Sequence, residues 1–245
     1  KGIEKTSSTI KKQTFKGFSC RLMRAKKRLV CIAEKIENAK CVADIGADHG
    51  FLTKMLIEQN RASKVIATDI SKPSLQKTVE LSKRFGFENK IEARVGNGFE
   101  PIKENEVDVA VIAGMGGQEI IKILKTQNLK NIQKFIFQPA QNAPELREFL
   151  SENGFEIIGD EIVKDQKKFY FTIIAIKNDK TEKLQKSQIL FGKYCQNCKN
   201  QDFYDFVDEY ILKRQNLIDQ KIENKKVQEE LNLALNLKNK YEGEL

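Results

Sequence analysis

Short β-rich runs alternate with amphipathic helical runs through the middle of this chain, and this alternation constrains the fold more than any other feature. The strand-like runs lie near residues 41–45, 64–69, 90–95, 107–112 and 133–138. The helical runs lie between them, near residues 51–60, 73–85, 116–126 and 144–153. Strict alternation of this kind predicts a mostly parallel sheet with helices on both faces.

Two further β-rich runs follow, at residues 155–163 and 168–176, and the four residues between them are too few for a parallel crossover. We therefore expect an antiparallel hairpin at one edge of the sheet. Five parallel strands closed by such a hairpin give a seven-stranded sheet. This is the plan of α/β proteins of the class I, Rossmann-like methyltransferase type rather than of dehydrogenases.

The two ends of the chain differ from this middle part. Residues 1–28 hold ten Lys or Arg and one acid, so the formal net charge of +9 comes from them. Such a basic arm favours nucleic acid as a partner, with membrane phosphates as an alternative. An amphipathic helix is expected from Ser19. Beyond residue 177, apolar residues at helical spacing predict two helices packed as a hairpin or coiled coil. We divide the chain into a basic arm, 1–27, a Rossmann-like domain, 28–177, and a C-terminal helical domain, 178–245.

Several classes of protein are disfavoured by composition. No apolar stretch approaches the roughly 20 residues of a membrane helix. Five cysteines without an apolar signal segment favour a reducing compartment, although the basic opening is also compatible with an organelle transit peptide. Cys195 and Cys198 have metal-ligand spacing, but His49 and scattered cysteines are the remaining ligands, so we expect free thiols and no metal. We expect a soluble, cytoplasmic protein with no membrane partner and no evident obligate protein partner.

The end of the first strand carries the most informative loop, which runs from Asp44 through Gly46, Asp48 and His49 to Gly50. A strand that ends and a helix that begins place such a loop where parallel sheets bind ligands, and glycines permit close approach. The glycine spacing is not that of the dinucleotide fingerprint, and two carboxylates would repel a pyrophosphate. Asp44 and Asp48 suit an ammonium group better, such as the methionine end of S-adenosylmethionine.

The next two strand ends carry nucleoside-binding chemistry. Asp69 follows Gly46 by roughly 20 residues, the usual interval for an acid that binds ribose hydroxyls. The third strand ends at Asn97, whose amide can bond an adenine edge, with Phe99 able to pack near it. A single acid after a strand is more often a helix cap, so the prediction depends on the three strand ends together. The predicted cofactor residues are Asp44, Gly46, Asp48, Asp69, Ile70, Asn97, Gly98, Ala113 and Gly114.

The fourth and fifth strand ends suggest an acceptor site at the same edge. Three glycines within Gly114–Gly117 make an open backbone wall against which a flat base could lie, although a tight turn is the simpler alternative. The fifth strand also ends at this edge, and a basic side chain follows on the next helix. The predicted substrate residues are Met115, Gly116, Gly117, Gln138, Pro139 and Arg147.

Taken together, these strand-end motifs resemble those of the bacterial TrmK family, the tRNA adenine-22 N1-methyltransferases. The resemblance is close over residues 28–177 and general in the helical tail. It implies a Rossmann-like methyltransferase domain, a coiled-coil-like C-terminal domain, S-adenosylmethionine as methyl donor and tRNA as acceptor. Two departures stand out: Gly50-Phe51-Leu52-Thr53 replaces the family's Ala-Tyr-Leu-Pro, and Asn97 replaces a common Asp.

The expected chemistry needs alignment more than activation, because adenine N1 carries a lone pair that can attack a sulfonium methyl directly. Asp48 and His49 are the candidate catalytic residues, placed to stabilise charge that develops on the purine. Holding the loop together is an equal alternative for His49. Other interpretations are a methyltransferase that acts on another RNA or a small molecule, and a non-catalytic, cofactor-sensing RNA-binding protein.

Overall fold

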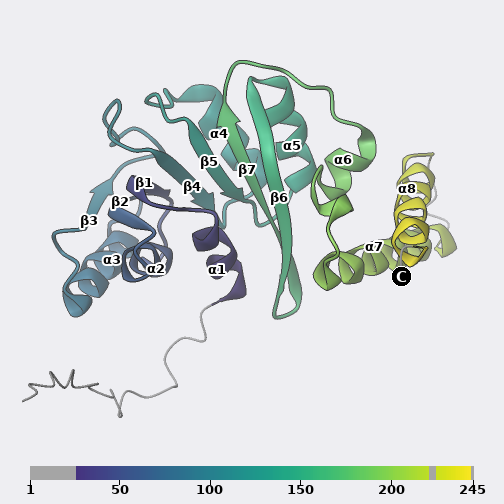
Figure 1. The fold of residues 1–245 in the computed structure, drawn as a ribbon, viewed down its shortest axis with the longest axis horizontal. Coiled ribbons are helices and arrows are strands. Elements are labelled where there is room, and N and C mark those ends of the chain that lie inside the picture. Colours follow the sequence, from purple (N-terminus) through teal and green to yellow (C-terminus); the bar gives the residue numbers. More distant parts are fainter. Residues whose placement is uncertain (1–25, 221–224, 244–245) are drawn as a thin grey trace, which may run out of the picture.

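The computed structural model describes residues 26–220 and 225–243, and its centre is one seven-stranded sheet in the order β3-β2-β1-β4-β5-β7-β6 (Figure 1). Strands β1 to β5 are parallel, and β7 pairs antiparallel with both β5 and β6. This confirms the predicted sheet. The strands are β1 Ala39–Ile45, β2 Ala62–Asp69, β3 Ile91–Val95, β4 Val109–Ala113, β5 Lys134–Gln138, β6 Phe155–Asp165 and β7 Lys168–Lys177.

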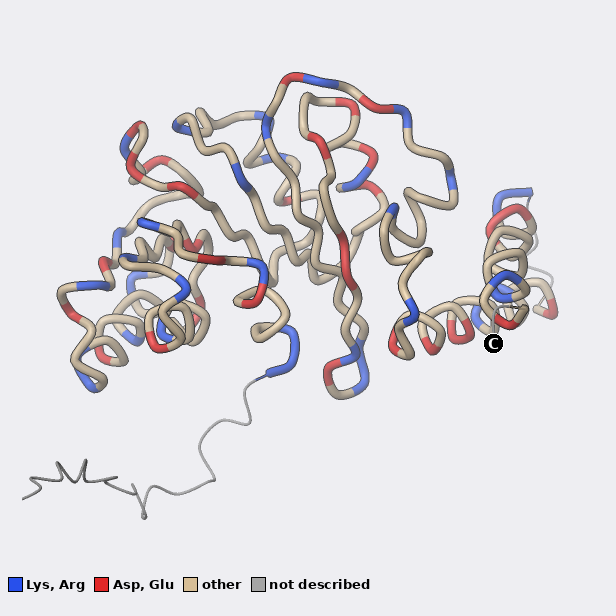
Figure 2. The backbone as a smooth tube through the Cα atoms, viewed as in Figure 1, with Lys and Arg blue, Asp and Glu red and all other residues tan. Residues whose placement is uncertain are grey.

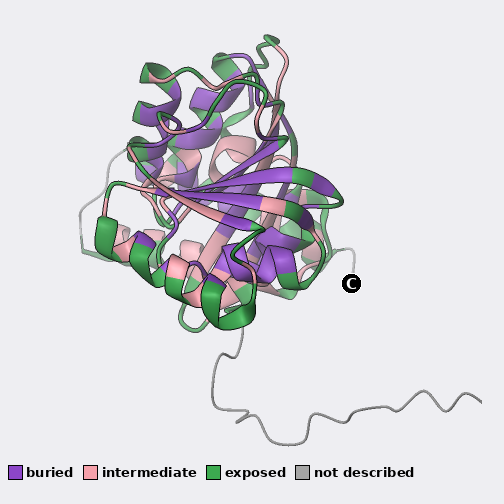
Figure 3. Cartoon of the chain, turned by 90° about the vertical axis from the view of Figure 1, so that its left-hand side faces the viewer, coloured by how far each residue is buried: buried purple, intermediate pink, exposed green. Residues whose placement is uncertain are grey.

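Helices cover both faces of the sheet because successive residues of a buried strand point to opposite sides. In β4, Ala110 and Ile112 belong to the apolar cluster that includes α4 and α5, whereas Val109 and Val111 belong to the cluster of α1 and α2. The central strands are largely buried (Figure 3). The helices are α1 Lys27–Glu34, α2 Phe51–Glu58, α3 Lys72–Phe85, α4 Gly117–Thr126 and α5 Ala143–Glu152.

The parallel register brings the carboxyl ends of β1 to β5 to one edge. Ile45 pairs with Thr68 of β2 and with Ile112 of β4, and Ala113 pairs with Gln138 of β5. Every loop that leaves these strands toward a helix therefore starts on the same side of the molecule, where ligands bind to open α/β sheets.

The hairpin is tighter and longer than predicted. The pairing of β6 with β7 continues to Asp165 opposite Lys168, so the turn consists of Gln166 and Lys167 alone. Gln166 has a φ of 57° in the left-handed region, which closes the turn in two residues. The predicted helix start at Ser19 and most of the basic arm lie outside the described residues.

The C-terminal part is helical, with α6 Lys186–Phe191, the 3-10 turn η1 Cys195–Asn197, α7 Gln201–Asp219 and α8 Lys225–Glu242. Helices α7 and α8 pack on each other, with the rings of Tyr204 and Tyr241 stacked at 4.2 Å, as expected for a helical pair. Lys225 and Lys226 lie in the first turn of α8. The short α6 was not predicted, because six residues give little periodicity.

A buried polar contact joins these helices to the sheet. The carboxylate of Asp160, on β6, accepts hydrogen bonds from the backbone N–H groups of Lys193, Tyr194 and Cys195. The guanidinium of Arg147 lies with its Nε 3.6 Å from Asp160 and donates to the carbonyl of Ile189 in α6. No helix within the described ranges is long and apolar enough to cross a membrane.

Candidate functional site

Two adjoining clefts open at the carboxyl edge of the sheet. The larger, about 640 Å³, lies beside the loop that follows β1, and the smaller, about 160 Å³, lies between the end of β3 and α4. They share Gly46, Asp69, Ile70 and Met115, so we treat them as one composite cleft. All nine predicted cofactor residues line it, and its size suits a small molecule.

The glycine loop is built as the sequence requires, but its amides are not free. Gly46 has a φ of 74°, and a Cβ there would collide with the side chain of Met115. Its N–H and that of Ala47 donate to the carbonyl of Thr68, at 2.8 and 3.0 Å. These two amides are therefore engaged within the sheet and do not face a ligand. Gly114, with a φ of 84°, instead has open space where a Cβ would point.

Asp44 is a buried carboxylate at the base of the cleft, 5% exposed. Burial, together with the nearby negative charge of Asp69, raises its pKa to about 6. A hydrogen bond from the Thr53 hydroxyl, at 2.8 Å, and the positive charge of Arg28 act in the opposite direction. A carboxylate this poorly solvated gains from a cationic partner, which an ammonium group would supply.

The second strand end offers both polar and apolar contacts. One carboxylate oxygen of Asp69 accepts the backbone N–H of Ser71 at 2.7 Å, which fixes the side chain beside the cleft. Ile70 is 73% exposed and gives the cleft an apolar wall. Asn97, at the end of β3, is exposed and lines the smaller cleft with Gly98. The hydroxyl groups of a ribose suit the carboxylate, and a purine suits the apolar and amide side chains.

Polar contacts link Asp48 to His49 and His49 to Lys77, a residue that the sequence analysis did not single out. His49 Nδ1 pairs with the carboxylate of Asp48, and Lys77 Nζ lies 2.9 Å from His49 Nε2. Because an ammonium group can only donate, Nε2 accepts, and the proton of the neutral imidazole is on Nδ1, facing Asp48. The ring stacks on Phe51. One lysine on the polar face of a helix gives no sequence signal that singles it out.

The start of α1 supplies two further side chains of the cleft, Lys26 and Arg28. Both belong to the basic run of residues 1–28, and Lys26 falls within the predicted arm, 1–27. Arg28 is anchored by Gln138, whose amide donates to the Arg28 carbonyl at 2.9 Å and to the Thr172 hydroxyl at 2.9 Å. The guanidinium of Arg28 also lies over the ring of Tyr170 at 5.5 Å.

Three predicted contacts are wrong because the side chains are fully buried. Gln138 is 0% exposed and engaged with α1 and β7, so it cannot contact a substrate directly. Arg147 is also 0% exposed, lies over the Phe171 ring and pairs with Asp160. Phe99 packs edge-on against Phe135 in the core and not beside a purine.

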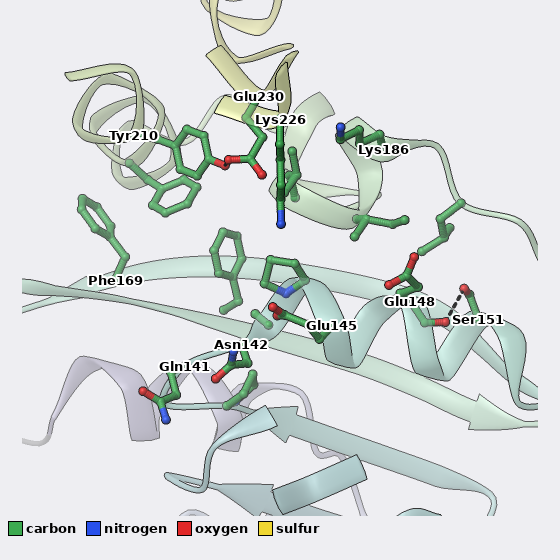
Figure 4. Close-up of a pocket in the computed structure, with 18 of the residues that line it drawn as sticks. Gln141, Asn142, Glu145, Glu148, Ser151, Phe169, Lys186, Tyr210, Lys226 and Glu230 are labelled. Atoms are coloured by element: carbon green, nitrogen blue, oxygen red, sulfur yellow. Dashed lines mark hydrogen bonds between the residues drawn. The ribbon is translucent and has the colours of Figure 1, made fainter. Parts of the chain in front are cut away.

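The other substrate candidates are spread over two places. Met115 lines the composite cleft, whereas Pro139 lines a separate cavity of about 790 Å³. We call this the lateral cleft; it lies between α5, β7 and the C-terminal helices (Figure 4). Gly116 caps the N-terminus of α4, and Gly117 is buried with its N–H donated to Gln141. The structure therefore brings Met115, but not the whole predicted set, to the cofactor side.

Within the described ranges, no group of three or more His, Cys, Asp or Glu is placed to hold a metal ion. Cys195 is buried and Cys198 is exposed. Burial, together with the nearby charge of Asp160, raises the pKa of the Cys195 thiol well above its ordinary value.

Comparison with known proteins identifies the family. A family model described as a methyltransferase domain matches residues 25–174. A Mycoplasma genitalium protein, named provisionally as a tRNA methyltransferase, is 36% identical over 179 residues, 71% of this chain and 80% of its own length. The tRNA (adenine(22)-N(1))-methyltransferase of Bacillus subtilis is 32% identical over 160 residues, 64% of this chain and 67% of that protein.

A solved structure agrees. TrmK from M. capricolum, in complex with S-adenosyl-homocysteine, superposes with a TM-score of 0.73 at 27% sequence identity, covering 87% of this chain and 96% of that one. The methyltransferase model covers more than half of the chain, and the Mycoplasma genitalium relative matches 71% of it. This chain therefore belongs to the TrmK family of tRNA methyltransferases.

Proposed function

We propose that this protein transfers the methyl group of S-adenosylmethionine to N1 of adenine 22 in tRNA. The observation that carries the proposal is the composite cleft, in which a buried carboxylate and a second acid stand at adjacent strand ends in a chain of this family. Its acids, Asp44 and Asp69, match an ammonium group and a ribose.

The residues of the cleft divide along the length of such a cofactor. Asp44 would accept hydrogen bonds from the ammonium group, and Arg28 would face the carboxylate beside it. Asp69 would accept the ribose hydroxyls, and Asn97 with Ile70 would border the adenine. Ala113 and Gly114 leave room at the floor. When bound, S-adenosylmethionine supplies an electrophilic methyl group on a sulfonium.

The acceptor base would enter beside Met115, opposite the loop that carries Asp48 and His49. Adenine N1 needs no base to become nucleophilic, so these residues act by orientation and charge. As positive charge develops on the purine, its N6 amino group becomes a stronger donor, and the Asp48 carboxylate can accept from it. His49 fixes that carboxylate through Nδ1, and Lys77 fixes the tautomer of His49.

The partner of this reaction is tRNA, whose target base must leave its stacked environment at a cost of a few kcal/mol. A tRNA substrate is consistent with our expectation that the protein acts in the cytoplasm. Positive side chains at the mouth of the cleft, Lys26 and Arg28, would offset the phosphate charge there.

The test uses labelled S-adenosylmethionine with two tRNA transcripts that differ only at position 22, adenine or guanine. We expect label in the adenine transcript, recovered as 1-methyladenosine and mapped to position 22 by a reverse-transcription stop. Equal label in both transcripts would assign the enzyme to another position. Binding of tRNA and S-adenosylhomocysteine without any transfer would instead indicate a cofactor-sensing RNA-binding protein.

A further inference from the structure

The β6–β7 hairpin extends past the carboxyl edge of the sheet, on the side where the composite cleft opens. Phe137 near the end of β5 pairs with Ile173, so residues 168–172 of β7 continue beyond the β5 ladder and pair only with β6. Figure 1 shows this two-stranded ribbon projecting beyond the other strands, next to the start of α1. No part of the cofactor chemistry described above requires such an extension.

The ribbon is held on both flanks, so its tip is positioned before any ligand arrives. On one flank the backbone N–H of Lys164 donates to Asp202 of α7 at 2.8 Å, and its ammonium group pairs with Asp205 at 3.2 Å. On the other flank the Arg28 N–H donates to Asp165 at 3.4 Å, and Tyr170 lies under the Arg28 guanidinium. Binding at the tip would therefore cost little additional ordering.

The charge of this region is concentrated and unpaired. Lys26 and Lys27 begin α1, Lys167 and Lys168 form the tip, and all four side chains are exposed. Among the described residues, none of these four ammonium groups has an ion-pair partner. The one acid of the tip, Asp165, already accepts the Arg28 amide. Figure 2 shows the two basic segments side by side, although they are far apart in the sequence.

We propose that the start of α1 and the hairpin tip form one phosphate-binding rim, Lys26, Lys27, Lys167 and Lys168, which holds the tRNA backbone beside the nucleotide to be methylated. The inference rests on the proposed function. Lys26 lines the composite cleft itself, so a backbone on the rim passes the opening through which the acceptor base enters. Holding the neighbouring phosphates lets the base leave its stack while the strand stays in place.

An anionic membrane surface would meet the same charges, but the rim lacks the apolar side chains that insert into lipid. Of the exposed large hydrophobic residues of the described chain, Ile70 lies in the wall of the composite cleft, and the others belong to neither basic segment: Phe85, Val95, Ile158, Tyr194, Leu212 and Leu235. We therefore favour RNA, and vesicle binding becomes one arm of the test.

The experiment compares two double variants of the full chain that lose the same charge at opposite edges of the sheet. Lys167→Ala/Lys168→Ala removes the tip, and Lys90→Ala/Lys180→Ala removes two exposed lysines that precede β3 and follow β7 at the other edge. The dissociation constant for tRNA is measured from 50 to 200 mM KCl. Each lost phosphate contact makes the slope of log affinity against log salt concentration shallower by about 0.7 to 0.9. The tip variant loses two such contacts, so between the two salt concentrations its affinity for tRNA should fall by a factor roughly tenfold smaller than that of wild type.

The control variant should keep the wild-type slope, and both variants should bind S-adenosylhomocysteine as wild type does. Lys27→Ala, on the α1 side, should lower the slope by about one contact. A tip variant with the wild-type salt slope would overturn the rim. So would a tip variant that loses as much affinity for S-adenosylhomocysteine as for tRNA. A tip variant that loses binding to phosphatidylglycerol vesicles but keeps its affinity for tRNA would also overturn it. If the slopes differ as expected but position 22 is not methylated, the proposed function fails while the rim stands as an RNA contact.

Discussion

Burial and ligand binding have opposite effects on the charge of the Asp44 carboxyl group. Its burial disfavours the charged form that an ammonium ligand needs, so the apo protein bears a cost that ligand binding relieves. Such residues are candidates for functional sites, because a fold selected for stability alone would replace the acid with a neutral side chain.

The pH dependence of Asp44 follows from its raised pKa. Its contribution to stability is present below the unfolded pKa of about 3.8 and is lost as pH rises through about 6. Asp44→Asn should therefore raise the free energy of unfolding at pH 8, by up to about 3 kcal/mol, and leave it little changed at pH 4. Urea denaturation at the two pH values measures this, and equal stabilisation at both would contradict it.

Ligand binding should depend on the same group with the opposite preference. In wild type the affinity for S-adenosylhomocysteine should rise as pH increases through about 6, because the ammonium group needs the ionised Asp44. Calorimetry of Asp44→Asn should show weaker binding with a flat profile over this range. A variant that keeps the wild-type rise would move the ammonium group to another acid.

Asp69 is expected to bind the ribose. One oxygen is fixed by the Ser71 amide, so the carboxylate is oriented before the ligand arrives. Asp69→Ala should weaken S-adenosylhomocysteine binding at least tenfold, since charge-assisted hydrogen bonds contribute roughly 1.5 to 3 kcal/mol each. Asp179→Ala, an exposed acid after β7, is the matched control. Unchanged affinity in a folded Asp69 variant would remove this residue from the site.

Asp48 and His49 are expected to act on turnover rather than on binding. Asp48→Asn and His49→Ala should bind S-adenosylhomocysteine and tRNA almost normally but lower kcat at least tenfold, about 1.4 kcal/mol of barrier. Lys77→Met should produce a smaller loss, because it leaves Asp48 and His49 in place but frees Nε2. Loss of cofactor affinity in proportion to kcat would instead assign either residue to the binding loop.

At the scale of elements, one buried amide connects α1 to the sheet. Gln138 ends β5 and donates to the carbonyl of Arg28, which lines the cleft, and to Thr172 of β7. It therefore supports the side chains that line the cleft without touching a ligand. The sequence correctly predicts that Gln138 lies at the carboxyl edge of the sheet, but it does not predict that the side chain is buried.

Gln138→Ala should destabilise the protein by about 1 to 3 kcal/mol, because a buried carbonyl and hydroxyl lose their donor. S-adenosylhomocysteine affinity should fall with it, since α1 would no longer hold Arg28 at the cleft. Gln133→Ala, on the exposed start of the same strand region, should change neither quantity. Thermal unfolding and calorimetry measure both, and full stability in Gln138→Ala would show that α1 is held by its apolar face alone.

At the scale of the whole molecule, the buried pair of Arg147 and Asp160 joins the C-terminal helices to the sheet. Asp160 accepts three backbone N–H groups of the segment after α6, and Arg147 lies against Phe171 within the same apolar cluster. Burial lowers the pKa of the Arg147 guanidinium, and the charge of Asp160 opposes that effect. The orientation of α7 and α8 therefore depends on residues of α5 and β6.

Asp160→Ala should cost about 3 to 5 kcal/mol, because it leaves a buried guanidinium without its counter-charge. The double variant Asp160→Ala/Arg147→Met should recover part of this loss, since the orphaned charge is gone. Asp208→Ala removes an exposed ion pair with Lys238 and a long hydrogen bond from the Tyr241 hydroxyl, and it should cost at most about 1 kcal/mol. Denaturation curves of the three proteins decide it, and a double variant less stable than Asp160→Ala would contradict the argument.

The sheet, its edge hairpin and the strand ends that line the cleft all follow from the amino-acid sequence alone. These features are local, because the spacing of apolar residues that predicts a strand or a helix is found within consecutive residues. Glycines and acids indicate where each strand ends. For this reason the order of strands and helices along the chain is enough to place Asp44, Asp69 and Asn97 at one edge of the sheet.

The choice of which polar side chains of that edge face the cleft and which face the core depends on the tertiary fold. Gln138, Arg147 and Phe99 are buried by elements distant in sequence, including α1, α6 and β7, and no local period reports what covers a side chain. The pairing of the basic α1 start with the hairpin tip has the same origin, because the Arg28 amide meets Asp165 across 137 residues of chain. Burial and long-range contact belong to the assembled fold, and that is where the roles of these residues are set.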